Sequence, residues 1–239
     1  MTDRCAAAAI GAVATVAALA TVAALAAAAA PVPFAHGSRR VKQVALTFDA
    51  CSADTGRGGY DARIATILRE HDAPATFFLG GAWMDAHPDD TRDLAATPRF
   101  ELATHGYAHP HLSRMASDQA RADIARGQAA LSAITGRTGT LFRPPYGQTD
   151  TRITTLAADL GLRLITFDLA SGDPDPKASA AKLIEYVPQV ARNGSVVVMH
   201  VNGRGWHTAE ALPEIIARLR RRGFELVTVG EMIAASERR

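Results

Sequence analysis

From residue 41 to residue 235, short apolar runs alternate with longer segments of helical periodicity, and this pattern leaves few folds open. Seven runs are predicted strands: residues 41–49, 75–79, 100–104, 141–143, 162–167, 195–200 and 224–229. Helices are predicted at residues 60–71, 89–96, 117–135, 149–160, 179–192 and 208–222, with a last helical turn at 231–235. Strands that alternate with helices pair in parallel, so the sequence predicts an α/β barrel or a doubly wound open sheet.

The residues that end the strands favour the barrel. Five strand ends carry polar, chemically capable side chains: Asp49, His105, Arg143, Asp168 and His200. In (β/α) barrels the active site lies at this carboxyl-terminal rim. An open sheet would normally offer a glycine-rich phosphate loop after its first strand, but residues 51–59 contain neither G-x-G-x-x-G nor G-K-[ST]. We therefore predict one α/β barrel domain over residues 41–235, with no second domain boundary.

The first 35 residues differ from the rest in composition. Residues 5–30 form an uncharged, alanine-rich run that follows Arg4 and ends at Pro31, which is typical of a secretory signal peptide. The run is also long enough for an uncleaved membrane anchor, which needs about 20 residues. Both interpretations place the folded part outside the cytoplasm, either periplasmic or secreted. Cys51 is then the only cysteine that remains, which excludes an internal disulfide.

The charge of the chain does not indicate a nucleic-acid partner. The net charge is +2, and the arginines near the C-terminus (Arg218, Arg220, Arg221, Arg222, Arg238 and Arg239) are not interleaved with aromatic residues. Such a run is typical of a solvated helix face. The sequence gives no indication of the oligomeric state.

Residues 104–113 read T-H-G-Y-A-H-P-H-L-S and contain three of the eight histidines, His105, His109 and His111. Two imidazoles four residues apart can bind one divalent ion through their neutral ring nitrogens. A glycine and a proline within the stretch disfavour a helix. We therefore expect His105 to end the strand and His109 to lie in the loop beyond it, with both rings directed at one point. A solvated histidine-rich turn is the alternative, because H-x-x-x-H is a short motif.

Three other strand ends have side chains suited to hydrolysis. Asp49 follows the apolar run A-L-T-F and could accept a proton from water, bind a cation or cap the next loop. Arg143, held in F-R-P-P-Y-G, suits bidentate binding of a carboxylate that must stay ionised. His200 ends a strongly β-branched strand, where it is either a hydrogen-bonded core residue or a general acid at the rim.

Together these segments resemble the NodB-type polysaccharide deacetylases, carbohydrate esterase family 4, over residues 41–235. The matching segments follow the order of the family: T-F-D at 47–49, H-x-x-x-H at 105–109, R-P-P-Y at 143–146, Asp168 and Asp173, and V-M-H at 198–200. The resemblance implies a distorted (β/α)7-8 barrel. It also implies metal-assisted hydrolytic removal of N-acetyl groups from a polysaccharide such as peptidoglycan, a chitin-like polymer or an exopolysaccharide.

The resemblance gives the acid and base residues their expected roles. Asp49 would be the general base, and Arg143 would orient it and tune its pKa. His200 would be the general acid, supported by Asp173 or, as second choice, by Asp168. The backbone N–H of Tyr146 would help to bind the oxyanion.

By the same resemblance, His105 and His109 would bind a divalent metal ion, with zinc as the expected ion. One position departs from the family, because the second aspartate of T-F-D-D is replaced by Ala50. Catalytic zinc generally has three protein ligands. The third ligand is therefore open, with four candidates: Asp49, Cys51, Asp54 and His207. T-F-D-A-C, together with N-G-R-G-W-H-T-A at 202–209, resembles a variant branch of the family.

Substrate contacts are expected from Tyr146 and from the loop after residue 200. Trp206 could stack on a sugar ring with His207 beside it, or both could pack within the loop. Two other functions compete with glycan deacetylation. One is a metal-independent hydrolase on the same scaffold that acts on a small amide or cyclic ureide. The other is a non-catalytic glycan-binding protein, for which Ala50 is the main argument.

Overall fold

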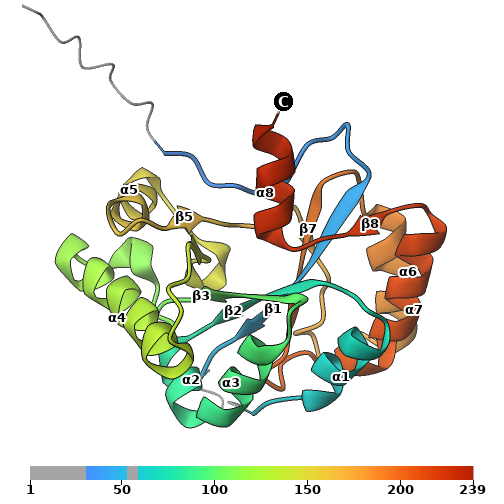
Figure 1. Ribbon diagram of the computed structural model, residues 1–239, viewed down its shortest axis with the longest axis horizontal. Coiled ribbons are helices and arrows are strands. Elements are labelled where there is room, and N and C mark those ends of the chain that lie inside the picture. Colours follow the sequence, from blue (N-terminus) through green and yellow to red (C-terminus); the bar gives the residue numbers. More distant parts are fainter. Residues whose placement is uncertain (1–30, 53–58, 239) are drawn as a thin grey trace, which may run out of the picture.

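The computed structural model describes residues 31–52 and 59–238, so the predictions for residues 1–30 and for Asp54 lie outside the described chain. The described residues form one parallel sheet, curled into a half-barrel, with helices along its outside (Figure 1). The strands are β1 (Gln43–Ala50), β2 (Ala75–Leu79), β3 (Phe100–Thr104), β4 (Leu141–Phe142), β5 (Arg163–Leu164), β6 (Leu169–Ala170), β7 (Ser195–His200) and β8 (Glu225–Leu226). The α-helices are α1 (Ala62–Glu70), α2 (Gly81–Ala86), α3 (Pro88–Ala96), α4 (Ser117–Thr135), α5 (Thr151–Asp159), α6 (Ala180–Val190), α7 (Thr208–Arg221) and α8 (Val229–Glu237).

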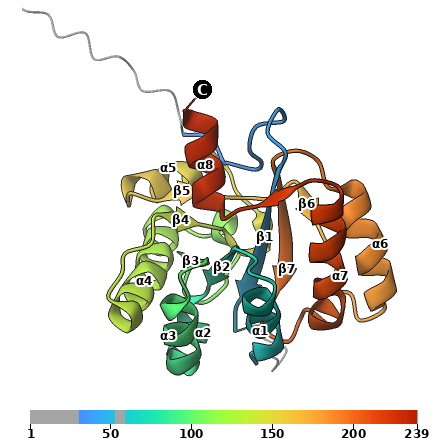
Figure 2. The same cartoon turned by 45° about the vertical axis from the view of Figure 1, so that its right-hand side comes forward.

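The strand β1 lies at the middle of the sheet. The strand order is β5-β4-β3-β2-β1-β7-β6, and β8 also pairs with β1. Every ladder in the described chain is parallel. Figure 2 shows α2, α3 and α4 on one side of β1 and α6 and α7 on the other, with α1 in front of β1 between the two groups. The prediction of a distorted α/β barrel is confirmed.

Alternation along β1 separates two faces of the sheet. Leu46, Phe48 and Ala50 are fully buried in the cluster that the outer helices cover. Successive side chains of a strand point to opposite faces, so Thr47 and Asp49 point to the inside of the curl. This alternation leaves the Ala50 methyl group in the outer core, on the opposite face from Asp49.

Some elements differ from their predicted forms. The helix α2 was not predicted, because its six residues are too few to show helical periodicity. The predicted strand 162–167 is shorter than expected, with only Arg163–Leu164 in β5, and the two-residue strand β6 follows it beyond the predicted range. The terminal helical turn is longer than predicted, because Thr228 forms a capping box with Glu231 and starts α8 two residues earlier.

Residues 34–37 belong to the fold, although they precede the domain predicted over residues 41–235. Phe34 forms a parallel bridge with Ile165, and its N–H donates to Leu164 O at 2.9 Å. His36 forms an antiparallel bridge with Ser195 at the start of β7. The segment thus bonds to both arms of the curled sheet. None of the helices within residues 31–52 and 59–238 is long and apolar enough to span a bilayer.

Candidate active site

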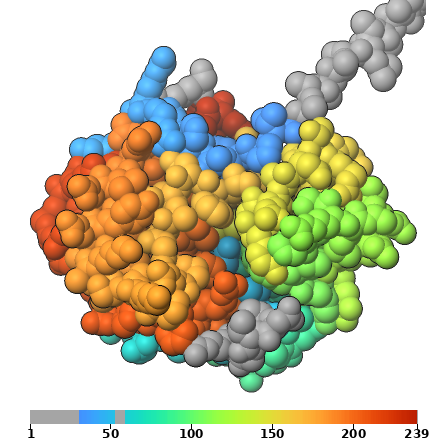
Figure 3. Space-filling view, turned by 180° about the vertical axis from the view of Figure 1, so that it is seen from behind, coloured from blue at the N-terminus to red at the C-terminus, as the bar shows by residue number. Residues whose placement is uncertain are grey.

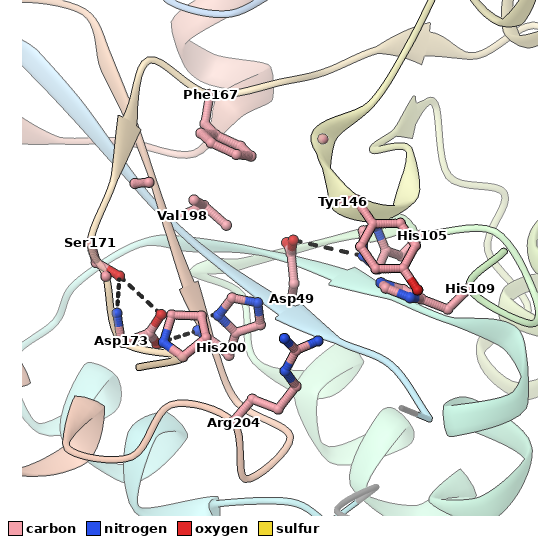
Figure 4. A pocket seen from close by; sticks show the side chains of 14 residues that line it. Asp49, His105, His109, Tyr146, Phe167, Ser171, Asp173, Val198, His200 and Arg204 are labelled. Carbon is pink, nitrogen blue, oxygen red and sulfur yellow. Dashed lines mark hydrogen bonds and ion pairs between the residues drawn. The ribbon is translucent and has the colours of Figure 1, made fainter. Parts of the chain in front are cut away.

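The strand register brings the predicted site residues to one rim. Asp49 pairs with His200 across β1 and β7, and Thr104 pairs with Phe142 just before His105 and Arg143. The pocket at this rim is lined by Asp49, His105, His109, Tyr146, Asp173 and His200, among others (Figure 4). Figure 3 shows a hollow between the orange and the yellow-to-green parts of the surface, with the blue of the β1 region at its floor.

Asp49 is held by a buried arginine. The fully buried Arg143 donates from Nη1 to Asp49 Oδ1 at 2.6 Å and to Thr47 Oγ1 at 2.8 Å. Phe78 lies against the guanidinium, 3.9 Å from its carbon to the ring centroid. The expected bidentate pair is not formed, because Nη2 is directed to Thr166 O at 3.4 Å. Asp49 Oδ2 is therefore left to the pocket, 3.8 Å from His105 Nε2.

These charges keep Asp49 ionised. Burial raises the pKa of its carboxyl group, but the positive charge and hydrogen bond of Arg143, together with the electrostatic effect of the nearby His105 and His200, outweigh burial. The resulting pKa lies below the usual 3.8. An ionised carboxylate with one oxygen open to the pocket is the form required of a general base.

His105 and His109 lie side by side, with ring centroids 5.0 Å apart. His105 Nδ1 is 2.8 Å from Arg143 O, and because a carbonyl can only accept, Nδ1 carries the proton and Nε2 is a free acceptor in the neutral ring. Burial lowers the pKa of His105, and burial with the neighbouring His105 lowers that of His109 to about 3. Both imidazoles are neutral near pH 7, which is the form that binds metal ions.

The loop between these histidines is fixed by α4. Asp123 Oδ2 accepts from the Tyr107 N–H at 2.9 Å, and Asp123 Oδ1 from the Ala108 N–H at 3.0 Å. His109 has φ +61°, a left-handed conformation that is uncommon outside glycine. The surrounding contacts therefore hold His109 in a conformation with an intrinsic cost, as is frequent at functional sites.

His105 and His109 are the two candidate metal ligands, and Asp49, whose Oδ2 lies 3.8 Å from His105 Nε2, does not complete a group of three with them in the described chain. Ala50 has no donor and faces the outer core. Cys51 is buried in contact with Asn202, and burial raises the pKa of its thiol to about 11, so it is not a thiolate. His207 bonds to Glu210 and does not line the pocket. Within residues 31–52 and 59–238 no group of three His, Cys, Asp or Glu could hold a metal ion. These donors do not fit a three-ligand catalytic zinc site.

Asp173, rather than Asp168, is the partner of His200. Asp173 Oδ1 accepts from His200 Nδ1 at 2.9 Å, and Oδ2 from the His200 backbone N–H at 2.7 Å. Burial lowers the pKa of His200, but the charge and hydrogen bond of Asp173 outweigh burial and raise it above 6.5. Asp168 instead bonds to Arg39 and to the Val196 N–H. Because Nδ1 is bonded to Asp173, the proton on Nε2 is the one available to the pocket.

The predicted substrate-binding residues are only partly in the pocket. Tyr146 lines it with φ +61°, and its ring is stacked on His111 at 4.0 Å between centroids. Trp206, which is 39% exposed, and His207 lie together on the loop between β7 and α7, and neither lines the pocket. Their contact with substrate stays a prediction.

Sequence reasoning missed several residues that line the pocket, among them Phe167, Ser171 and Arg204. Ser171 Oγ bonds to Asp173 Oδ1 at 3.0 Å and so supports the partner of His200. Arg204 lies between two glycines in N-G-R-G-W, a loop that directly follows the His200 strand. That position was the available signal for Arg204, because loops after barrel strands line the active-site rim.

Residues 36–165, just over half of the chain, match a family model described as Polysaccharide deacetylase. The bifunctional xylanase/xylan deacetylase of Cellvibrio japonicus is 31% identical over 189 residues, which cover 79% of this chain and 27% of that protein. The peptidoglycan-N-acetylglucosamine deacetylase of Bacillus cereus is 28% identical over 200 residues, 82% of this chain and 70% of that protein. The chain thus spans about a quarter of the first relative and most of the second.

Solved structures of the same family share the fold. A CE4 family pseudoenzyme from Bacillus anthracis has a TM-score of 0.77 and 27% identity, covering 85% of this chain and 69% of that chain. A family 4 carbohydrate esterase from Streptomyces lividans, solved with acetate, has a TM-score of 0.67 and 29% identity, covering 77% of this chain and 90% of that chain. These matches agree with the family suggested by the motifs, while the T-F-D-A-C branch stays a prediction.

Proposed function

The chain belongs to the polysaccharide deacetylase family, and from this premise we propose that it hydrolyses N-acetyl groups from an N-acetylated polysaccharide. The expected enzyme class, a hydrolase of carbon–nitrogen bonds, is confirmed by the named relatives. The observation that carries the proposal is the pairing of Asp49 with His200 across β1 and β7, each with its own counter-ion.

The two ion pairs support a division of roles. Asp49, kept ionised by Arg143, accepts a proton from water as the water oxygen attacks the acetyl carbonyl carbon. His200, kept protonated by Asp173, then donates its Nε2 proton to the amide nitrogen, so that the carbon–nitrogen bond breaks. Acetate and the free amine of the sugar leave. Without this proton the amine would have to depart as an anion, which is a much poorer leaving group.

The negative charge of the tetrahedral intermediate needs a stabilising donor. We assign this role to the backbone N–H of Tyr146, on the rim beside His109. We derive no step through a metal ion, because the described donors do not complete a site. His105 and His109 stay the predicted ligands of a divalent ion, with zinc as the predicted metal.

The substrate and location are inferred from relatives. Several are named peptidoglycan deacetylases, including those of Bacillus cereus and Bacillus subtilis. Peptidoglycan is therefore the first polymer to test, with chitin-like polymers and exopolysaccharides after it. Such substrates lie outside the cytoplasm, which agrees with the signal segment or membrane anchor predicted from the sequence.

The test is acetate release from each polymer by wild type, Asp49→Asn and His105→Ala. Arg92→Gln is the control, because Arg92 is exposed and, within the described chain, forms its ion pair with the exposed Asp89. We expect release by wild type and control and its loss in Asp49→Asn. Metal analysis and a chelator arm, with zinc added back, test the metal prediction separately. Unchanged turnover in chelator would support the metal-independent alternative.

A glycan-binding protein without catalysis is the second candidate, favoured by Ala50 and by the likeness to a protein described as a pseudoenzyme. Its signature is glycan binding that survives Asp49→Asn, with no acetate released from any polymer. The retained Asp49–Arg143 and Asp173–His200 pairs support catalysis instead.

A further inference from the structure

Arg204 places a positive charge in the pocket that the proposed chemistry does not use. It lies in the loop between β7 and α7, and its guanidinium points into the pocket between His200 and Asp49 (Figure 4). The residue is partly exposed and so can be reached from solvent. The other arginine of the site, Arg143, is fully buried and bonded to Asp49.

Neither carboxylate that lines the pocket pairs with Arg204, whose side chain instead hydrogen-bonds to the neutral Cys51 thiol and so keeps its charge uncompensated there. Asp49 is bound by Arg143, and Asp173 by His200 and by the hydroxyl of Thr208 at 2.7 Å. No ion pair formed among residues 31–52 and 59–238 includes Arg204. With His200 protonated, three positive groups face two carboxylates. Among the described residues, the pocket is therefore suited to one further negative charge.

The loop that carries Arg204 is anchored on both sides. Asn202 donates from Nδ2 to Cys51 O at 2.6 Å, and the Trp206 N–H donates to Asp173 O at 3.3 Å. Gly205 is packed so closely that an added Cβ would lie 2.3 Å from His200 O. The backbone at Arg204 is thus fixed next to the acid residue, which limits the entropy lost when its side chain binds a ligand.

We propose that Arg204 binds a carboxylate of the substrate, so that the preferred glycan is acidic. This inference rests on the proposed function and names its substrate class. The planar guanidinium matches a carboxylate with two parallel N–H donors. Because Arg204 and Asp49 line one pocket, the carboxylate lies on the sugar that loses its acetyl group or on its neighbour.

The test compares two forms of one glycan. Linear fragments of alternating N-acetylglucosamine and N-acetylmuramic acid are used with free carboxylates and as methyl esters, so that charge changes while the acetyl groups do not. For wild type we expect kcat/KM to be roughly tenfold higher for the acid form, in line with a charge-assisted hydrogen bond. Arg204→Gln should bring this ratio near one, Arg204→Lys should give an intermediate ratio, and Arg92→Gln should keep the wild-type ratio.

The ratio of kcat/KM for the acid form to kcat/KM for the ester form separates an effect on carboxylate binding from an effect on the chemical step. If wild type shows no preference, or if Arg204→Gln keeps the preference, the inference is overturned. An equal loss of kcat on both forms would instead place Arg204 in the chemical step and would also overturn it. Calorimetric binding of both forms runs in parallel. Preference in binding without acetate release would retain the Arg204 subsite and reject the proposed function.

Discussion

At the scale of single residues, two buried ion pairs set the protonation states that hydrolysis needs. The pKa of Asp49 lies below its usual value, because Arg143 and the neighbouring imidazoles outweigh burial. The pKa of His200 lies above its usual value, because Asp173 outweighs burial. Between these two pKa values Asp49, the proposed base, is ionised and His200, the proposed acid, is protonated. A bell-shaped pH profile is expected, with its alkaline limb above pH 6.5.

Replacing Asp173 with Asn should move the alkaline limb of kcat/KM to lower pH. The substitution removes the charge that raises the pKa of His200, so that burial dominates and lowers it. Because the pKa of His200 is raised in the folded state, protonated His200 stabilises the fold below pH 6.5. This stabilisation is lost as the pH rises through the folded-state pKa of His200. Asp173→Asn should therefore lose more unfolding free energy at pH 5.5 than at pH 9. The pH profile of kcat/KM and urea unfolding at pH 5.5 and pH 9 measure these two effects. An alkaline limb that stays at its wild-type pH would show that Asp173 does not raise the pKa of His200.

Replacing Arg143 with Met should move the acidic limb of kcat/KM to higher pH. Burial then acts alone on Asp49 and raises its pKa. Removing one partner of a buried ion pair costs about 3–5 kcal/mol of unfolding free energy. Arg143→Lys is the matched variant, because it keeps the charge and should shift the limb less. Circular dichroism verifies that Arg143→Met is folded. If the folded variant keeps the acidic limb of kcat/KM at its wild-type pH, Arg143 does not lower the pKa of Asp49.

At the scale of elements, α4 determines where the two histidines lie. Asp123 accepts from two backbone N–H groups of the loop, and Gly127 lets the loop approach the helix. A Cβ at Gly127 would lie 2.4 Å from Gly106 O, which is backbone and cannot swing away. The close contact between α4 and the loop therefore requires a glycine at a position where alanine would otherwise favour the helix.

Gly127→Ala should lower both activity and stability. In an open helix this change would add up to about 1 kcal/mol of stability, but here the clash should cost about 1–3 kcal/mol and displace His105 and His109. We expect kcat/KM to fall at least roughly tenfold, as for a misplaced catalytic group. Ala129→Gly on the exposed face of α4 is the control, with stability lowered by about 1 kcal/mol and kcat/KM kept. Thermal unfolding and initial rates measure the two effects. A Gly127→Ala variant that is more stable than wild type and fully active would contradict the predicted clash with Gly106.

At the scale of the whole molecule, the N-terminal segment ties the two arms of the curled sheet together. Phe34 bonds to the β5 side, and Gly37 donates to Gly194 O beside β7 at 2.8 Å. Arg39 pairs with Asp168 at 2.8 Å, and Asp168 in turn accepts from the Val196 N–H. Asp168 is thus part of the closure of the barrel rather than of the acid pair.

Asp168→Ala should lower stability and leave the pH profile unchanged. The Val196 N–H loses its acceptor, which costs about 1–3 kcal/mol when the group is buried. Because Asp168 has no contact with His200, the alkaline limb of kcat/KM should stay in place, unlike that of Asp173→Asn. Urea unfolding with rate profiles on the same preparations tests the contrast. A shifted alkaline limb in Asp168→Ala would restore Asp168 as a partner of His200.

The sequence by itself determined the parallel α/β fold, the strand ends that carry Asp49, His105, Arg143 and His200, and the family. Periodicity and the order of short motifs are local properties, so they can be read without contacts. The resemblance already favoured Asp173 over Asp168 as the partner of His200, and the structure shows that contact. Tertiary structure alone decided that Arg143 donates one hydrogen bond to Asp49 and that Arg204 enters the pocket. Each of these depends on the register of distant strands and on the path of a loop. The spacing of residues along the chain does not specify either.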